Sequence, residues 1–312
     1  MDKNIDLVYL WVDGNDPKWL KKKSSITGQP FDNSEVNCKG RFIENSELKY
    51  SLRSVEKYAP WIQNIYIVTD DQIPDWLNTE NSKIKIIDHK EILPDTARPC
   101  FNASVIEYFL YKIPNLSEYF LFANDDMFFN KPLTPDYFFT DDGFPIVRHK
   151  RKYYGKFGNY IKTNIGKKPG QYRQMIIDGV ELIRDKFNVY YSGVPHHNID
   201  AYLKSDFRNA VEVVFKQEVE RCTPNHIRTV GDLNRATFLL YSLAINHAKL
   251  KYVNRKQSVR LLPYKHDLKK YLNKHDPDLF CINDNQRVKD EHRALIEPFL
   301  KELFPEKSDF EK

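Results

Sequence analysis

The chain has 312 residues, of which 41% are hydrophobic, 29% charged and 14% aromatic. That is enough apolar material to bury a core, so global disorder is excluded. The net charge of +5 does not by itself indicate a nucleic-acid binder, and we expect no nucleic-acid partner. The four cysteines lie far apart without a CxxC pair, which argues against a zinc ribbon or a disulfide framework and fits a reducing cytosol.

The sequence offers no membrane-spanning segment. The N-terminus enters a strand-like run almost at once and lacks the pattern of a signal peptide. The longest nearly apolar run, residues 236–245, is far shorter than the roughly 20 residues that cross a bilayer. We therefore expect a cytoplasmic protein with at most a peripheral contact at the inner face of the membrane.

The first half of the chain alternates strand and helix signals. Helical spacing of apolar residues occurs at 46–58 and 106–113, and a proline follows each segment. Short apolar runs predict strands at 5–12, 65–69, 84–88 and 119–123. Because these runs are apolar on both faces, they indicate a mostly parallel central sheet that is flanked by helices. The predicted fold class is therefore α/β.

Acidic residues follow three of the predicted strands. Asp13-Gly14 follows the first, Asp70-Asp71 the second, and Asn124-Asp125-Asp126 the run at 119–123. Ligands of open α/β sheets bind beyond the carboxyl ends of the strands, so we expect these acids to converge on one rim. The Asp70-Asp71 pair is interpreted as structural.

The triplet Asn124-Asp125-Asp126 is the most informative motif. Adjacent carboxylates repel each other and stay ionised together most easily beside a cation. Mg²⁺ or Mn²⁺ prefers oxygen ligands and often bridges a carboxylate to a substrate phosphate. The alternative is a solvated turn, since Asn and Asp are common turn residues, and the same alternative applies to Asp13.

The second half is less regular. Residues 148–168 hold eight Lys or Arg and no acid, which suggests a mobile loop or excursion. Its default interpretation is a solvated surface, and its functional interpretations are contacts with an anionic polymer, nucleotide phosphates or an anionic membrane. Helices are predicted at about 233–249 and at 287–304, the latter interrupted by Pro298.

We find no clear linker, so the predicted organisation is a single catalytic domain over residues 1–312. Its predicted parts are an α/β nucleotide-sugar core at 1–147, a basic insert or lid with a histidine-containing segment at 148–230, and a helical C-terminal part at 231–312 that completes the active site.

Several catalytic motifs are absent. There is no P-loop, no GxGxxG after a strand, no GxSxG elbow and no HxxxH zinc spacing. The adjacent His196-His197 could bind metal, donate to phosphate or act as an acid–base group.

Several segments together resemble the Stealth proteins, sugar-1-phosphate transferases of bacterial capsule synthesis. This family includes the catalytic subunit of the animal N-acetylglucosamine-1-phosphotransferase. The resemblance is dense up to residue 140 and thinner beyond it. The matching segments are 5–17 (IDLVYLWVDGNDP), 47–77, 86–94, 101–129 (FNASVIEYFLYKIPNLSEYFLFANDDMFF), 194–200 (VPHHNID) and 279–285 (LFCINDN).

The resemblance implies a GT-A-like nucleotide-sugar transferase fold, Mg²⁺ or Mn²⁺, and a UDP-sugar donor that carries an N-acetylhexosamine. It also implies transfer of sugar plus phosphate to the hydroxyl of a polysaccharide or a lipid-linked oligosaccharide, with release of UMP. By motif, the implied catalytic residues are Asp13, Asp126, His197 and Arg228. The implied substrate-binding residues are Arg53, Asn102, Asn124 and Asn283, and the implied metal ligands are Asp125, Asp126 and Asp284.

Two alternatives stay open. A metal-dependent glycosyltransferase would share the metal site and the donor but would release UDP. A non-catalytic module that binds polysaccharide or membrane would need neither Asp126 nor a nucleotide. The general base is also open, because either Asp13 or His197 could accept the proton of the acceptor hydroxyl.

Overall fold

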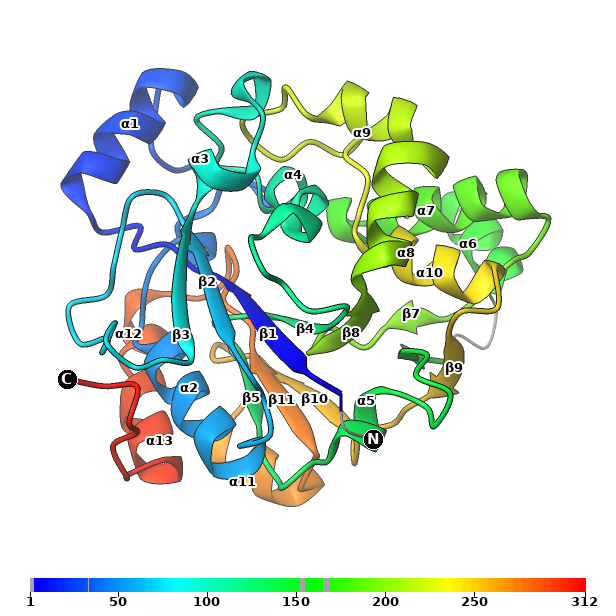
Figure 1. Ribbon diagram of the computed structural model, residues 1–312. Coiled ribbons are helices and arrows are strands. Elements are labelled where there is room, and N and C mark those ends of the chain that lie inside the picture. The colour runs from blue at the N-terminus through cyan, green and yellow to red at the C-terminus, as the bar shows by residue number, and fades with distance from the viewer. Residues whose placement is uncertain (1–2, 33, 152–154, 165, 167–168) are drawn as a thin grey trace.

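The computed structural model describes residues 3–32, 34–151, 155–164, 166 and 169–312 (Figure 1). Its central sheet has the strand order β3-β2-β1-β4-β8. The strands are β1 (Ile5–Leu10), β2 (Ile65–Thr69), β3 (Ile84–Asp88), β4 (Tyr119–Asn124) and β8 (Asp200–Leu203). The first four run parallel, and β8 pairs antiparallel with β4. The predicted α/β class with a mostly parallel sheet is confirmed.

Two smaller sheets complete the strand framework. One has the order β10-β11-β5, formed by β10 (Ser258–Leu261), β11 (Leu279–Ile282) and β5 (Met127–Phe129). The other has the order β7-β6-β9, formed by β7 (Val194–Pro195), β6 (Ile146–Lys150) and β9 (Lys249–Tyr252). In the first sheet β11 runs antiparallel to β5, so the end of β11 lies beside the start of β5.

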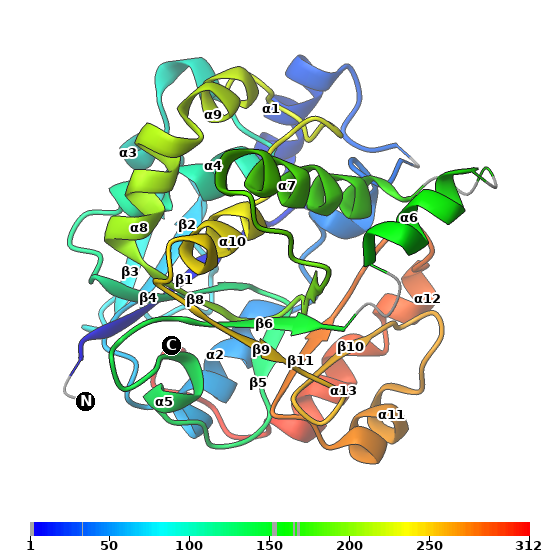
Figure 2. The same cartoon turned by 90° about the vertical axis from the view of Figure 1, so that its right-hand side faces the viewer.

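Helices cover both faces of the central sheet (Figures 1 and 2). In the first half they are α1 (Pro17–Thr27), α2 (Glu47–Tyr58), α3 (His89–Ile92), α4 (Ala103–Tyr108) and α5 (Pro135–Phe138). In the second half they are α6 (Gly155–Asn164), α7 (Gln171–Phe187), α8 (Lys204–Asn209), α9 (Lys216–Cys222), α10 (Ala236–Ala244), α11 (Leu268–His275), α12 (Asp290–Arg293) and α13 (Ile296–Leu303). Short 3-10 helices occupy Lys39–Arg41, Asp95–Ala97 and Leu110–Lys112, and a π-helix occupies Ala210–Val214.

Strand periodicity explains how both faces of the sheet are buried. Along β4, Phe120 and Phe122 enter one hydrophobic cluster, whereas Leu121 and Ala123 enter another. Successive strand side chains point to opposite faces, so each face receives its own apolar set. The second cluster is covered by α2, which contributes Leu48, Leu52 and Val55.

The second half departs from its predicted outline. The C-terminal part contains β9, β10 and β11 as well as helices, and the helix expected over 233–249 spans only Ala236–Ala244. Pro298 lies in the first turn of α13, where its missing N–H costs no helix bond, so the interruption falls before α13 instead. Because β8 joins the central sheet and β11 pairs with β5, the predicted boundaries at 147 and 230 do not separate independent sheets.

The basic stretch also differs from its prediction. Arg148 and His149 are buried in β6, and the Arg148 guanidinium lies 3.9 Å from the centre of the Tyr137 ring. Residues 155–164 form helix α6 rather than a loop. The remaining positions 152–154, 165 and 167–168 lie outside the described residues. Within the described part of the chain, no helix combines the length and apolar character needed to cross a membrane.

Candidate active site

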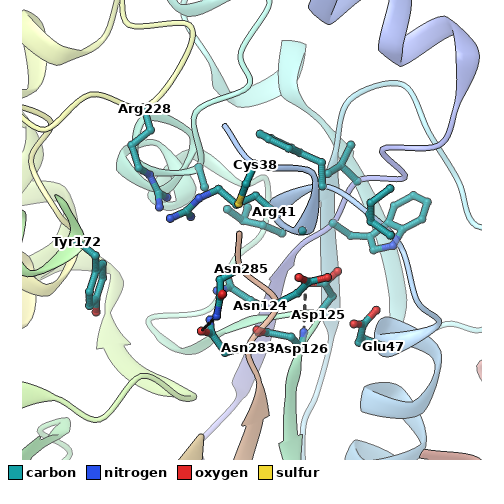
Figure 3. A pocket seen from close by; sticks show the side chains of 18 of the residues that line it. Cys38, Arg41, Glu47, Asn124, Asp125, Asp126, Tyr172, Arg228, Asn283 and Asn285 are labelled. Carbon is teal, nitrogen blue, oxygen red and sulfur yellow. Dashed lines mark hydrogen bonds between the residues drawn. The ribbon is translucent and has the colours of Figure 1, made fainter. Parts of the chain in front are cut away.

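A cavity of about 430 Å³ opens beyond the carboxyl ends of the central strands (Figure 3). Its lining includes Leu10 and Trp11 after β1, Val68 of β2, and residues 124–126 after β4. Parallel pairing places Leu10 opposite both Val68 and Asn124, which brings these strand ends to one edge. Of the acids expected to converge at the rim, Asp125 and Asp126 line the cavity, whereas Asp13 and the Asp70-Asp71 pair do not.

Strand register also brings Asp284 to the same cavity. The backbone N–H of Ile282, at the end of β11, donates to the carbonyl of Asp126 at 2.9 Å. Asn283 and Asp284 follow directly and line the cavity. Two acidic segments more than 150 residues apart in sequence thus meet, because β5 starts where β11 ends.

The carboxylates of Asp125 and Asp126 are poorly compensated. The N–H of Asp126 donates to Oδ1 of Asp125 at 3.1 Å, and the Cys281 thiol donates to Oδ2 of Asp126 at 3.2 Å. Oδ1 of Asp126 is buried without a hydrogen-bond partner among the described residues. Burial raises the pKa of Asp126 to about 6, and burial followed by repulsion from Glu47 and Asp126 raises the pKa of Asp125 well above its usual range.

Glu47 is a site residue that the sequence analysis missed. It lies in the first turn of α2, lines the cavity and accepts hydrogen bonds from the backbone and side chain of Asn45 at 2.7 and 2.9 Å. Burial raises its pKa to about 8. In the sequence, a glutamate at a helix start indicates only a favourable interaction with the helix dipole. We define Glu47, Asp125 and Asp126 as the acidic floor.

The floor offers oxygen atoms, the donor type that a hard divalent cation prefers. Carboxylate and amide oxygens are the ligands that Mg²⁺ prefers, and a cation would supply the missing partner of Asp126 and offset the repulsion in the floor. Asp284 is already engaged, because its two oxygens accept from Arg293 Nε at 2.6 Å and Nη2 at 2.9 Å. Within the described ranges, no three His, Cys, Asp or Glu side chains are gathered closely enough to hold a metal ion.

Arginines from distant segments also line the cavity, and we call this set the cationic wall: Arg41, Arg228, Arg235, Arg260 and Arg287. The guanidinium ends of Arg41 and Arg228 lie close together on the side opposite Asp125 and Asp126 (Figure 3). Burial within the cavity, and then repulsion from Arg228, lowers the pKa of Arg41 to about 10. Two facing guanidinium groups are stabilised best by an anion between them.

Arg235 is a fixed cation that the sequence analysis also missed. Its Nη1 donates to Oδ2 of Asp200 at 2.8 Å and to the Tyr202 hydroxyl at 2.6 Å. Its guanidinium lies 4.2 Å from the centre of the Phe122 ring. Asp200 is in turn bonded to His196 Nε2 at 3.1 Å. No short motif surrounds Arg235, so only the pairing of β8 with β4 reveals its place.

The histidine pair divides into two roles. His196 is buried and faces Asp200, whereas His197 lines the cavity with its ring centre 5.7 Å from that of Tyr172. The backbone of His197 has φ 59°, a left-handed conformation that turns its ring away from that of its neighbour. Burial and then the charges of Arg260 and Arg235 lower the pKa of His197 to about 3, so the imidazole is neutral at neutral pH.

Three residues assigned from sequence lie outside the cavity lining. Asp13 accepts from the N–H of Asn15 at 2.8 Å in a turn at the rim. Arg53 pairs with Glu311 at 2.7 Å and binds the carbonyl of Phe304, which ties α2 to the C-terminus. Asn102 is buried, caps α4 and donates to Asp232 at 2.7 Å. The other predicted residues all line the cavity: Asn124, Asp125, Asp126, His197, Arg228, Asn283 and Asp284.

Comparisons with known proteins identify the family of the chain. Stealth protein conserved region 1 matches residues 3–29, conserved region 2 matches 41–147, and conserved region 4 matches 270–312. The chain is 37% identical over 293 residues to the capsular polysaccharide phosphotransferase fcs1 of Haemophilus influenzae, covering 90% of this chain and 78% of that one. It is 30% identical over 331 residues to the capsular polysaccharide phosphotransferase WcwK of Streptococcus pneumoniae, covering 98% and 99%.

Other relatives are longer. The chain spans 51% of the exopolysaccharide phosphotransferase SCO2594 of Streptomyces coelicolor, to which it is 32% identical. Among solved structures, it resembles the galactosyltransferase LgtC with a TM-score of 0.47 and 12% identity, covering 96% of this chain and 95% of that one. It resembles the bifunctional glycosyltransferase WbbM with a TM-score of 0.46 and 10% identity, covering 98% and 52%.

These relatives are 30–37% identical to the chain over 90% or more of its length, and the family regions match from β1 to the C-terminal helices. The chain therefore belongs to the Stealth family.

Proposed function

We propose that this chain is a phosphotransferase of capsular or cell-surface polysaccharide synthesis. It transfers N-acetylhexosamine-1-phosphate from a UDP-linked donor to a hydroxyl group of an acceptor sugar. The products are a phosphodiester and UMP. The observation that carries the proposal is a single cavity that is lined by both the acidic floor and the cationic wall.

A sugar diphosphate matches both sides of this cavity. Arginine forks two phosphate oxygens, so Arg41 and Arg228, which repel each other when nothing lies between them, gain most from a bound diphosphate. Arg235 is held by Asp200 and Tyr202 and presents a charge that does not need to reorganise. The aromatic rings of Trp19, Phe42 and Phe101 at the cavity edge offer an apolar surface for a base or sugar ring.

The bond changes follow from the proposed products. The acceptor oxygen attacks the phosphorus that bears the sugar, and the bond from that phosphorus to the bridging oxygen of UMP breaks. The hydroxyl proton passes to a base, and UMP leaves with the bridging electrons. The arginines of the cationic wall stabilise the charge that develops on the phosphoryl oxygens.

The floor would hold Mg²⁺ or Mn²⁺ through Asp125 and Asp126, and Asp284, which now binds Arg293, would be a further ligand. When bound, such an ion neutralises charge on the diphosphate. The neutral imidazole of His197 can donate its N–H to a phosphoryl oxygen, or accept the acceptor proton, from its place beside Arg235 and Arg260. Asp13 is less well placed for either task, since its carboxylate is engaged in a turn at the rim.

The leaving group tests the proposal against its nearest rival. The protein is incubated with a panel of UDP-sugars, a polysaccharide acceptor and Mg²⁺ or Mn²⁺, and the released nucleotide is identified by mass. Release of UMP with a sugar-1-phosphate joined to the acceptor supports phosphoryl transfer. Release of UDP would identify a glycosyltransferase and overturn the proposal.

A further inference from the structure

Helix α6 carries a cluster of exposed apolar side chains. Phe157 is 66% exposed, Tyr160 65% and Ile161 41%. Their spacing of three and four residues places them on one face of the helix. Apart from Tyr252 of β9, the other large hydrophobic residues that are exposed in the described part of the chain lie singly on other elements: Ile26, Ile73, Val213, Val230 and Leu295.

Basic residues are frequent in the sequence around this helix. The stretch from 148 to 168 contains eight Lys or Arg and no acid, although Arg148 itself is buried. Strand β9 pairs with β6 and adds the exposed Lys249 and Lys251, while the Arg151 guanidinium lies 4.6 Å from the centre of the exposed Tyr252 ring. Strand β9 and helix α6 lie on the same side of the molecule, the right-hand side of Figure 1, which faces the viewer in Figure 2.

We propose that this side of the molecule docks on the surface of an anionic lipid bilayer. We define the docking face by its described residues: Arg151, Phe157, Tyr160, Ile161, Lys249, Lys251 and Tyr252. An amphipathic helix with apolar side chains on one face and basic residues around it binds at a bilayer interface. Its apolar side chains insert between the lipids, and its basic residues attract the anionic headgroups.

The chemistry of the face favours lipid over a polysaccharide. A sugar ring stacks on flat aromatic surfaces and requires hydrogen-bond partners for its hydroxyl groups, and Ile161 offers neither. Hydrocarbon accepts Ile161 and Phe157 equally well. The absence of acids from 148–168 suits an anionic bilayer surface, where each carboxylate would be repelled.

Helix α6 is connected to the cavity through the start of helix α7. Helix α7 follows α6 in the chain and begins at Gln171, whose backbone N–H donates to Oε2 of Glu35 at 2.9 Å. Both Glu35 and the next residue, Tyr172, line the cavity. Docking through α6 would therefore hold the cavity beside the bilayer, where an acceptor with a lipid anchor would reside.

Vesicle binding tests this proposal independently of catalysis. The full chain is sedimented with vesicles of phosphatidylcholine and phosphatidylglycerol at a ratio of about 7:3, and with vesicles of phosphatidylcholine alone. We expect binding to the first and much weaker binding to the second, with a steep loss as salt is raised. The triple variant Phe157→Ser, Tyr160→Ser, Ile161→Ser should bind the anionic vesicles on the order of tenfold more weakly.

A matched control carries Ile73→Ser and Val213→Ser, which remove side chains that are 55% and 67% exposed on other elements. The control should bind as the unsubstituted chain does, and both variants should release nucleotide normally with a soluble acceptor. Failure of the unsubstituted chain to bind anionic vesicles would overturn the proposal. Unchanged vesicle binding in the triple variant would also overturn it. If that variant kept its vesicle binding but lost self-association, the face would be a contact between copies of the chain. If it instead lost affinity for a soluble anionic polymer, the face would be a polymer-binding surface.

Discussion

The acidic floor and the cationic wall are built in different ways. Asp125 and Asp126 of the floor follow β4 directly, and strand register sets their place beside Leu10 and Ile282. The wall instead gathers arginines from a 3-10 helix, from loops, from the start of α10 and, for Arg260, from strand β10. The two carboxylates after β4 are thus placed by backbone pairing, whereas most of the wall is assembled from segments that share no sheet.

The charges of the two regions are also stabilised differently. The floor carboxylates are buried with few donors, which raises the pKa of Asp125, Asp126 and Glu47. In the wall, Arg235 has its own counter-ion in Asp200, while Arg41 faces another arginine. The floor is suited to a cation and the wall to an anion, and substitutions in each should have separable effects.

The largest effect is expected in the floor. Asp126→Asn should lower the rate of nucleotide release on the order of a thousandfold, because it removes the charge that would hold a cation beside the diphosphate. The melting temperature should stay the same or rise, since a desolvated, repelled carboxylate is lost. The exposed Asp71→Asn, at the end of β2, is the matched control. Near-normal turnover in Asp126→Asn would show that the Asp126 carboxylate is not needed for the reaction.

Removing divalent metal ions from the unsubstituted protein should lower nucleotide release about as much as Asp126→Asn does. Treatment with EDTA should stop nucleotide release, and added Mg²⁺ or Mn²⁺ should restore it, because the unpartnered oxygen of Asp126 fits a hard cation. Turnover is measured before treatment, after chelation and after restoration. Full activity in the chelator would exclude a dissociable metal at the floor.

In the wall, Arg228→Lys should lower kcat/KM on the order of a hundredfold. Lysine keeps the charge but loses the planar fork that holds two phosphate oxygens. The exposed Arg255→Lys serves as the control for charge-conserving substitution. Equal kinetics in the two variants would show that Arg228 contributes only charge and would weaken the contrast between floor and wall.

Arg53 should affect stability rather than chemistry. Its pair with Glu311 leaves the two side chains 11% and 4% exposed, so Arg53→Ala should lower the free energy of unfolding by about 3 kcal/mol. Denaturant unfolding measures this change, and Arg208→Ala, in an exposed pair with Glu212, should cost less than about 1 kcal/mol. If Arg53→Ala lost turnover but kept its stability, Arg53 would be a substrate-binding residue, as the sequence resemblance implies.

The last prediction concerns Lys23, which contacts Phe42, the residue that follows Arg41 of the wall. Lys23 is buried, donates to the Pro30 carbonyl and to Asn37 Oδ1 at 2.6 Å each, and lies 3.5 Å from the centre of the Phe42 ring. Burial lowers its pKa to about 7. Between that value and the ordinary pKa of about 10.4, the unfolded chain binds more protons than the native one, so stability should rise with pH.

The expected slope is up to about 1.4 kcal/mol per pH unit between pH 7 and 10. Unfolding in denaturant across this range measures it, and Lys23→Met should flatten the rise. An equally steep rise in Lys23→Met would assign the pH dependence to another group.

The sequence predicted the floor better than the wall, for a physical reason. Runs such as 65–69 and 84–88 have a local apolar pattern, and the structure has strands at those same residues. Once the strands are parallel, the acids that follow them must share one edge. Six of the seven predicted residues that line the cavity follow a strand end or lie in a segment that resembles the Stealth family, and Arg228 is the exception.

Other features could not be predicted from local pattern. Glu47 resembles an ordinary helix-start residue, and Arg235 is defined only by its contacts with Asp200 and Tyr202. Asn102 and Arg53 lie in matching segments, yet their side chains are used to cap α4 and to anchor the C-terminus. A polar residue in a recognisable segment can stabilise the fold or bind a ligand, and sequence alone does not distinguish these uses.

The pairing of β5 with β11 determines which parts of such a chain can change in length without moving the acidic segments. The chain leaves the floor at Phe129 and returns at Leu279, and hydrogen bonds between these two short strands fix where it returns. Extra residues inserted in the surface loops of that long excursion would cost little closure entropy and would leave both acidic segments in place. Loops between Phe129 and Leu279 can therefore change, for example to suit another acceptor, while the hydrogen bonds between β5 and β11 keep the two acidic segments together.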